Sequence, residues 1–343
     1  MKKILVIATG GTIACSDSGD GLKPSYDVND LLAHIPSINE ACDVTGELIM
    51  NIDSTNMNPK FWVKIGTVIN KNYRLYDGFV VTHGTDTLAY TSAGMSYILN
   101  GLKKPVVFTG AQHSIEEFGT DAKQNLNDAI LYALEGIPGV FVAFDGKIIN
   151  GTRAMKVKTK SLDAFSSVNY PFVAKVKYGK VYHNHDLERK FIQAAFGEFS
   201  VDTQLCTDIM VLKLFPGMDT KIFDFIKDNY KGLIIESFGT GGIPFENNDI
   251  ISKVKELVEN GMPVVVTTQC LEEGIDFEIY EVGRKLIQSN IIFAKNMNTE
   301  AIVAKLMWAV SKGDNLAEVK YLMEEPKMDD CLKYPIQADC LTI

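Results

Sequence analysis

The chain has 343 residues, a formal net charge of −9 at pH 7, 46% hydrophobic residues and 22% charged residues. This length favours two domains, and the composition is that of a globular protein rather than a disordered chain. The acidic balance disfavours nucleic acid as a partner, because a negative surface repels phosphate backbones. The first apolar run is too short for a secretory signal, and no run could span a membrane, so we expect a cytoplasmic protein without a membrane partner.

Short apolar runs alternate with helical patterns in the first half of the chain. A helical stripe from Leu126 to Leu134 follows Thr120-Asp121 and ends at Gly136 and Pro138. The apolar runs end in small or polar residues, as buried parallel strands often do, and they cover residues 4–8, 79–82, 105–109 and 140–144. This order predicts a parallel sheet with helices on both faces.

The stretch around His183-Asn184-His185-Asp186 is polar and lacks strong periodicity. We therefore expect an N-terminal catalytic α/β domain at 1–182, a linker at 183–207 and a smaller C-terminal α/β domain at 208–343. In the second domain, Gly261 ends one helical stripe, and Asn298-Thr299 caps another. Its candidate strands are 209–214, 233–235, 264–266 and 291–293.

The first strand runs into a glycine-rich turn, Thr9-Gly10-Gly11-Thr12. Ligands of open α/β sheets bind beyond the carboxyl ends of the strands, and two glycines let the backbone approach a small ligand closely. An ordinary turn or a phosphate-binding nest is the alternative interpretation. A P-loop or a dinucleotide fingerprint is not favoured, because neither motif is present.

Two further segments combine hydroxyls with an acid. The segment Asn51-Ile52-Asp53-Ser54-Thr55 suits a zwitterionic ligand, although a solvated turn is favoured when it is considered alone. The segment Thr82-His83-Gly84-Thr85-Asp86-Thr87 follows a strongly apolar strand. A serine-hydrolase interpretation with His83 as the base is possible, but a histidine on such a strand is more often a core residue.

Lys156 follows Arg153-Ala154-Met155 and is the candidate base. Burial would favour a neutral amine, whereas a solvated lysine is the alternative. A threonine nucleophile needs a partner that takes its proton. Lys156 can serve through the hydroxyl of Thr85, with Asp86 balancing the charge and backbone amides near the glycine turn stabilising an oxyanion.

No metal site is expected. The six cysteines are scattered and form no C-x-x-C pair, which disfavours zinc and dithiol redox motifs. His183 and His185 lie close together in the sequence, but their polar surroundings favour a solvated stretch.

Two motifs at a large separation resemble the signatures of the bacterial-type L-asparaginases. They are Ala8-Thr9-Gly10-Gly11-Thr12-Ile13-Ala14 and Thr82-His83-Gly84-Thr85-Asp86-Thr87, and the likeness extends to Asp163-Ala164-Phe165 and Thr268-Gln269-Cys270. Without a signal peptide, the chain is similar to the cytoplasmic, type I branch. The resemblance implies a two-domain asparaginase-like α/β fold with a larger N-terminal parallel-sheet domain, no metal or organic cofactor, and a homodimer or homotetramer.

The resemblance also implies an activity and roles for particular residues. The expected reaction is hydrolysis of L-asparagine to L-aspartate and ammonia through a threonine acyl-enzyme. Thr12 would be the nucleophile, and Thr85, Lys156 and Asp86 would assist proton transfer and hydrolysis of the intermediate. The substrate's α-carboxylate and α-amino groups would be held by Asp53, Ser54 and Thr55, together with Asp86 for the ammonium.

Several positions depart from the family pattern. Leu22 stands where the tyrosine of the flexible loop is expected, and Tyr26 lies four residues further on; residues 16–21 are rich in small residues and fit a mobile lid. Thr240 replaces an amide, with Asp276 or Glu278 as the acid lent to a neighbouring site. At the regulatory site of some type I members, Cys270 matches, whereas Glu236 and Met155 replace an arginine and a threonine, which predicts weak or absent activation by asparagine.

Three other functions compete with this one. A preference for glutamine is the first, because one methylene changes binding by only about 1–3 kcal/mol. The second, an ammonia-releasing component of a tRNA amidotransferase, is less favoured, because that version carries an extra N-terminal domain and the signature here begins at residues 4–9. The third is a non-catalytic amino-acid sensor, which would have little use for Lys156 beside Thr85.

Overall fold

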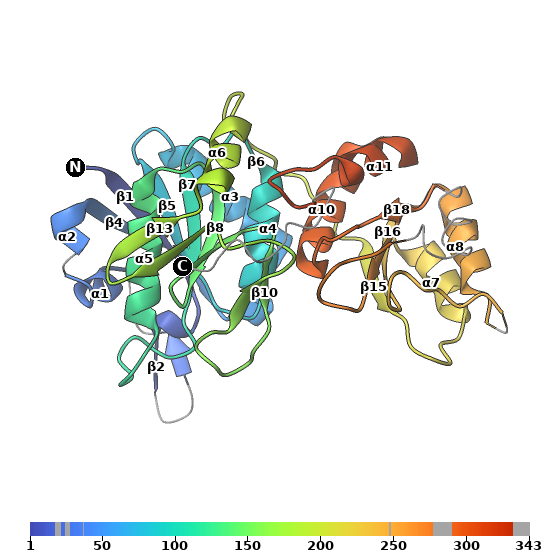
Figure 1. Cartoon of the computed structure of the whole chain (residues 1–343), viewed down its shortest axis with the longest axis horizontal. Coiled ribbons are helices and arrows are strands. Elements are labelled where there is room, and N and C mark those ends of the chain that lie inside the picture. The colour runs from blue at the N-terminus through green and yellow to red at the C-terminus, as the bar shows by residue number, and fades with distance from the viewer. Residues whose placement is uncertain (18–21, 25–27, 37, 247, 277–289, 332–343) are drawn as a thin grey trace. The chain divides into compact units, whose positions relative to one another are not determined.

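The computed structural model describes residues 1–17, 22–24, 28–36, 38–246, 248–276 and 290–331 (Figure 1). The chain forms two compact units, each with its own sheet. Unit 1 comprises Met1–Ser167 and Pro171–Thr203, and unit 2 comprises Val168–Tyr170 and Gln204–Ile343. In the described part of the chain, no helix combines the length and the hydropathy needed to cross a lipid bilayer.

Unit 1 contains an eight-stranded mixed sheet in the order β13-β12-β9-β8-β7-β5-β1-β4. Its first five strands along the chain are parallel, and they are β1 (Lys3–Gly10), β4 (Asp43–Ile52), β5 (Gly78–Thr82), β7 (Pro105–Thr109) and β8 (Gly139–Phe144). The other three are antiparallel, and they are β9 (Lys147–Asn150), β12 (Ala174–Lys177) and β13 (Lys180–His183). The four strands predicted from continuous apolar runs are confirmed. Edge strand β4 was not predicted, because among its residues only Met50 is buried and no continuous apolar run marks it.

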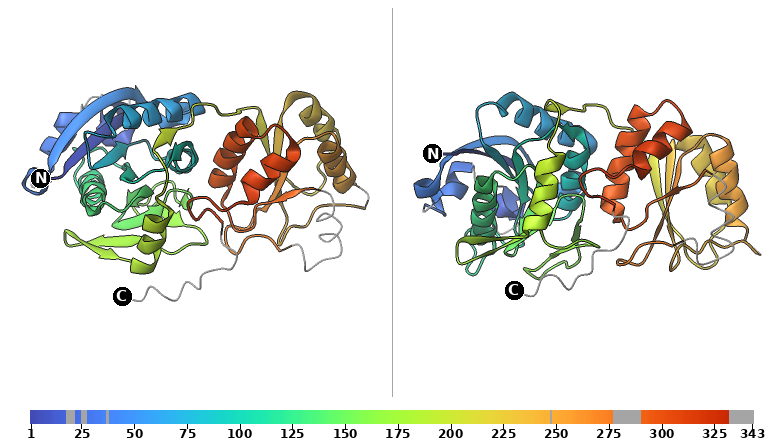
Figure 2. Two further views of the ribbon diagram at one scale, coloured as in Figure 1. Left: turned by 90° about the horizontal axis from the view of Figure 1, so that it is seen from above. Right: turned by 45° about the horizontal axis from the view of Figure 1, so that its top comes forward.

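Helices cover both faces of this sheet (Figure 2). Phe141 of β8 contacts Tyr132 of α5 (Ala122–Glu135) and Phe191 of α6 (His185–Ala194) edge to face. The neighbouring Val140 points the other way, where Gly151 lies against both its side chain and Ser96 of α4 (Leu88–Ile98). Consecutive strand residues face opposite sides of a sheet, so α5 and α6 share one face and α4 covers the other. Helix α3 (Pro59–Asn72) joins α4 through the Trp62 indole, which donates to Thr91 Oγ1 at 3.1 Å.

Helix α6 and the short strand β14 (Ser200–Val201) lie within the stretch 183–207 that was expected to be a linker. The helix buries Leu187 and Phe191, four residues apart, and Asn184 caps its start. Two buried apolar residues give too weak a periodicity for a sequence-based prediction. The division between the units falls after Thr203.

Smaller elements complete unit 1. The 3-10 helices η1 (Thr12–Ala14) and η2 (Ser54–Asn56) follow the first strand and the edge strand. The remaining elements are β2 (Cys15–Asp17), β3 (Leu22–Pro24), α1 (Val28–Ala33), α2 (Ile38–Ala41), β6 (Leu99–Asn100), β10 (Ala154–Lys156) and β11 (Phe165–Ser167).

Unit 2 is a smaller parallel α/β unit, as predicted. Its sheet has the order β15-β16-β17-β18, formed by Ile209–Lys213, Gly232–Ser237, Val264–Thr268 and Ile292–Phe293. Its helices are α7 (Lys221–Asn229), α8 (Ile250–Glu259), α10 (Thr299–Lys312) and α11 (Leu316–Glu324). The predicted cap is confirmed, because the Asn298 side chain accepts from the Ala301 amide.

One buried carboxyl in unit 1 is incompletely satisfied. Asp128 of α5 is 1% exposed. One oxygen accepts from Gln124 Nε2 at 2.6 Å, whereas the other has no hydrogen-bond partner among the described residues. Burial raises the pKa of Asp128 to about 7. The folded unit therefore favours the protonated form of this side chain below about pH 7.

Replacing Asp128 by asparagine should stabilise the protein in a pH-dependent way. The unfolded carboxyl ionises near pH 4, whereas the folded one keeps its proton to about 7, so the wild type loses stability as pH rises between these values and no further above them. From pH 5.5 to 7.5, the advantage of Asp128→Asn should grow by about 1–2 kcal/mol. The midpoint of thermal unfolding, measured for both proteins across this range, checks it. A difference that does not change with pH would contradict the raised pKa.

Candidate active site

A turn with two left-handed glycines ends β1 and leads to Thr12. Gly10 has φ of +102° and Gly11 has φ of +89°, a region that other residues rarely adopt. A Cβ on Gly10 would lie 2.6 Å from the backbone N and O of Ile52. The glycines thus let the chain leave the sheet beside the end of β4. Thr12, half-buried, is the first residue of η1.

The glycine turn after β1 contacts the turn that follows β5, and this second turn also contacts η2. A Cβ on Gly11 would lie 2.5 Å from the N and Cα of Gly84, and a Cβ on Gly84 would lie 2.6 Å from Ser54 Oγ. Thr87 Oγ1 donates to the backbone oxygen of Ser54 at 2.8 Å. The three polar segments singled out from the sequence therefore meet at the carboxyl ends of neighbouring strands β4, β1 and β5.

Lys156 completes this cluster from a fourth segment. Its Nζ lies 2.7 Å from Thr85 Oγ1 and 2.7 Å from Asp86 Oδ1. The lysine side chain is 17% exposed and the aspartate side chain 56% exposed, so the ion pair lies at the mouth of the site. Pairing of β10 with β11 supports the lysine backbone, and Asp86 lies two residues before the almost wholly buried helix α4.

The residues expected to hold an amino acid's polar groups lie on η2. Asp53 caps this helix, and its Oδ1 accepts from the Thr55 amide at 2.8 Å and from Thr55 Oγ1 at 2.9 Å. Asp53 and Thr55 are exposed, whereas Ser54 is buried against Gly84. A carboxylate and hydroxyls thus stand beside the Thr85–Asp86 turn, ready to contact a zwitterion.

His83 is a core residue, as predicted, although it directly follows the last residue of β5 instead of lying on the strand. It is fully buried, and Nδ1 contacts the backbone oxygen of Gly84 at 2.7 Å. Desolvation lowers the pKa of His83 to about 4, so the ring is neutral near pH 7. The serine-hydrolase interpretation with His83 and Asp86 is not favoured, because Asp86 contacts Lys156 instead.

The proposed lid and small-domain residues are only partly described. Leu22 pairs with Asp17 in the hairpin of β2 and β3, whereas Tyr26 and Glu278 lie outside the described residues. In unit 2 the Asp276 amide donates to the backbone oxygen of Thr240 at 3.0 Å. At the matched regulatory positions, Cys270 is exposed, Met155 lies in β10, and Glu236 accepts from Thr299 Oγ1 at 2.7 Å.

Gln112, which follows β7, was not predicted from the sequence, although it contacts Thr85 of this cluster. Thr85 Oγ1 donates to Gln112 Oε1 at 3.3 Å, and Gln112 Nε2 donates to the backbone oxygen of Ser161 at 3.1 Å. Its position after a strand end could have indicated it. Gln112 lies three residues after Thr109, the last residue of β7, and β7 is the neighbour of β5 in the sheet.

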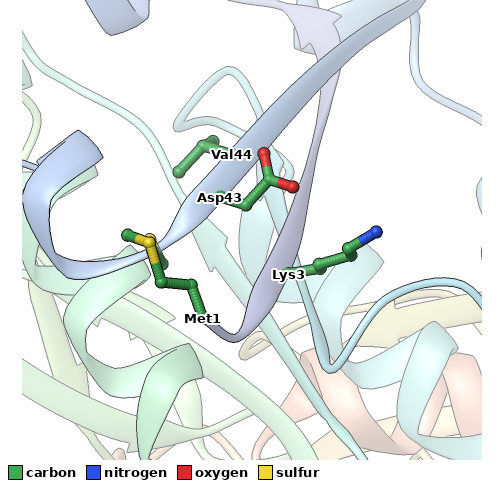
Figure 3. A pocket seen from close by; sticks show the side chains of 5 residues that line it. Met1, Lys3, Asp43 and Val44 are labelled. Carbon is green, nitrogen blue, oxygen red and sulfur yellow. The ribbon is translucent and has the colours of Figure 1, made fainter.

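Two other features do not belong to this site. The hollow in Figure 3 is lined by Met1, Lys3, Cys42, Asp43 and Val44, at the amino ends of β1 and β4. His183 contacts Glu188 through Nδ1, and its Nε2 lies 3.3 Å from Glu135. Within the described ranges, no group of three or more His, Cys, Asp or Glu side chains could hold a metal ion.

Comparisons with known proteins identify the family. Residues 3–189 match the family described as "Asparaginase, N-terminal", and residues 208–323 match "Glutaminase/Asparaginase C-terminal domain". The chain is 38% identical to an L-asparaginase of Thermococcus kodakarensis over 94% of this chain and 97% of that protein. It is 35% identical to a component of the glutamyl-tRNA(Gln) amidotransferase of Pyrococcus abyssi, over 94% of this chain and 75% of the relative.

Solved structures agree with the sequence relatives. The thermostable L-asparaginase from Thermococcus kodakarensis superposes with a TM-score of 0.91 at 37% identity, covering 97% of this chain and all of that one. L-asparaginase I from Vibrio cholerae gives 0.85 at 28% identity, covering 96% and 99%. The fold and the two matched domains define a two-domain α/β amidohydrolase. The chain belongs to the asparaginase family, as its two sequence motifs predicted.

Replacing Gly11 by alanine should lower kcat by more than the strain of its positive φ alone would explain. The added Cβ meets the Gly84 backbone at 2.5 Å and pushes apart the turns that carry Thr12 and Thr85. We expect kcat to fall by about 100-fold, together with a lower melting temperature. Gly119→Ala is the matched control, because Gly119 also has a positive φ, +77°, but nothing lies within 4 Å of its Cβ position. Equal effects of the two substitutions on kcat would show that the close approach is unimportant.

Proposed function

We propose that this protein is an L-asparaginase that hydrolyses L-asparagine to L-aspartate and ammonia through a threonine acyl-enzyme. The observation that carries the proposal is the Lys156 amine within 2.7 Å of both Thr85 Oγ1 and Asp86 Oδ1. This group adjoins the turn of Gly11 and Thr12, and its residues stem from segments far apart in the chain. A non-catalytic sensor would not require an amine beside a threonine hydroxyl.

In the first step, Thr12 Oγ attacks the carbon of the substrate's side-chain amide. A hydroxyl is a weak nucleophile and needs a base, which is Lys156 in its neutral form acting through the Thr85 hydroxyl. Backbone amides at the glycine turn stabilise the negative oxygen of the tetrahedral intermediate. The C–N bond then breaks, the nitrogen takes up the transferred proton and leaves as ammonia, and an ester to Thr12 remains.

In the second step, water attacks that ester. The group of Thr85, Lys156 and Asp86 takes a proton from the water, and Thr12 recovers its own proton as the C–O bond breaks and L-aspartate leaves. Asp86 is well suited to balance the charge on Lys156 because the two form an ion pair. Asp53, Ser54 and Thr55 bind the α-carboxylate and α-amino groups, and Asp86 also contacts the ammonium.

L-Glutamine is the second candidate substrate. Relatives named as components of glutamyl-tRNA(Gln) amidotransferases match 94% of this chain at up to 35% identity, and the C-terminal family is named for both glutaminases and asparaginases. The cytoplasmic location, the homodimer or homotetramer, and weak or absent activation by asparagine stay predictions of the sequence.

The substrate is tested by measuring ammonia release from L-asparagine and L-glutamine over a concentration series. We expect a higher kcat/KM on asparagine and hyperbolic kinetics. Thr12→Ala should abolish turnover on both amides while asparagine binding, followed by calorimetry, is retained. Wild-type protein that binds asparagine but releases no ammonia would be a sensor, and appreciable hydrolysis by Thr12→Ala would move the nucleophile elsewhere.

Replacing Lys156 by methionine should act mainly on kcat. The substitution keeps most of the apolar stem but removes the amine that accepts the proton, a role worth about 10²–10⁴-fold in rate. Lys158→Met is the control, because Lys158 lies two residues further on and pairs with Asp163. Steady-state kinetics on L-asparagine measure both. An unchanged kcat in the Lys156 variant would reduce this lysine to a structural role.

A further inference from the structure

Gln112 contacts the Thr85 hydroxyl as a hydrogen-bond acceptor, whereas Lys156 contacts it as a donor. The hydroxyl has a single proton to donate, and both its neighbours are close: Lys156 Nζ at 2.7 Å and Gln112 Oε1 at 3.3 Å. A protonated lysine can only donate, and the amide oxygen can only accept. With Lys156 charged, the Thr85 proton must therefore point to Gln112. With Lys156 neutral, the amine's lone pair competes for the same proton.

We infer that Gln112 is a positioning residue that orients the Thr85 hydroxyl and thereby biases the protonation of Lys156. This inference rests on the proposed function of the Thr85–Lys156–Asp86 group. Because the amide oxygen accepts the hydrogen bond from the Thr85 hydroxyl, a lone pair of Thr85 Oγ1 is free to accept a hydrogen bond from the Lys156 ammonium. Removing that acceptor leaves the neutral amine as the hydroxyl's only acceptor among these contacts.

The backbone on either side of Gln112 is held firmly. The amides of Gln112 and His113 donate to the buried Asp121 carboxylate at 3.0–3.1 Å. Asn125 donates to Asp121 and to the backbone oxygen of Gly110, each at 3.0 Å. A Cβ on Gly110 would lie 2.3 Å from the backbone oxygen of His83, so the turn after β7 closely contacts the turn that carries Thr85.

The side chain of Gln112 also has its second end fixed. Nε2 donates to the backbone oxygen of Ser161 at 3.1 Å, which identifies the oxygen as the end that meets Thr85. Among the described residues, the charged groups linked to this hydroxyl through its contacts are the Lys156–Asp86 pair and Asp121, which accepts from the Gln112 backbone. Gln112 is thus an oriented, uncharged acceptor within a charged surrounding.

Two substitutions should shift the pH dependence in opposite directions. Gln112→Met keeps the shape but removes the acceptor, which favours the neutral amine and moves the rising limb of kcat against pH to lower pH. Gln112→Glu adds a negative acceptor, which favours the ammonium and moves that limb to higher pH. We expect a shift of about 0.5–1 pH unit in each variant, with little change in KM.

The measurement is ammonia release from L-asparagine across pH 5–10 by wild type and both variants, with Glu116→Ala as a control on the same loop. Gln112→Leu replaces the methionine variant if that protein does not fold. Limbs that stay at the wild-type pH, or that move in one direction for both variants, overturn the inference. Failure of the proposed function is seen separately, as absent wild-type turnover or as turnover by Thr12→Ala.

Discussion

The close approach of Gly11 to the Gly84 backbone, and of Gly84 to the Ser54 side chain, is the constraint on which the site depends. A single Cβ at either glycine would come within 2.5–2.6 Å of its neighbour, far inside ordinary contact. With a side chain at Gly11, the turns after β1 and β5 would separate, and with one at Gly84, the Ser54 side chain would have to move. Because the first of these contacts is between backbones, the turns that carry Thr12 and Thr85 are placed by the rigid sheet rather than by flexible side chains.

Charge in the site is balanced at its surface rather than in the core. Lys156 and Asp86 form an ion pair that solvent reaches mainly from the aspartate side. In unit 1, desolvation favours the neutral forms of two strongly buried titratable groups, His83 and Asp128, because burial penalises a charge. Acid–base chemistry is therefore concentrated where a substrate can arrive, and Gln112 adds a neutral hydrogen-bond acceptor to that place.

The strands and the amphipathic helices were predictable because their signals are local. Residues 79–82 and 105–109 are continuous apolar runs and form buried central strands, and the stripe before Gly136 forms α5. Strand β4 and helix α6 were missed, since an exposed edge strand and a helix with two buried apolar residues barely differ from loops in hydrophobic pattern. Thr12 and the Thr85–Asp86 turn were found by their position after predicted strands, a rule that Gln112 also satisfies.

The family, the two-domain α/β class and two of the polar segments of the site could be predicted from the amino-acid sequence, because motifs and periodicity are properties of neighbouring residues. Which of these residues meet depends on how the chain folds in space. Lys156 reaches Asp86 across 70 positions of sequence, and Gln112 reaches Thr85 across 27. These contacts follow from the order of the strands in the sheet and from the close approach of turns whose glycines have no room for a Cβ. Neither feature can be predicted from a local pattern of residue types.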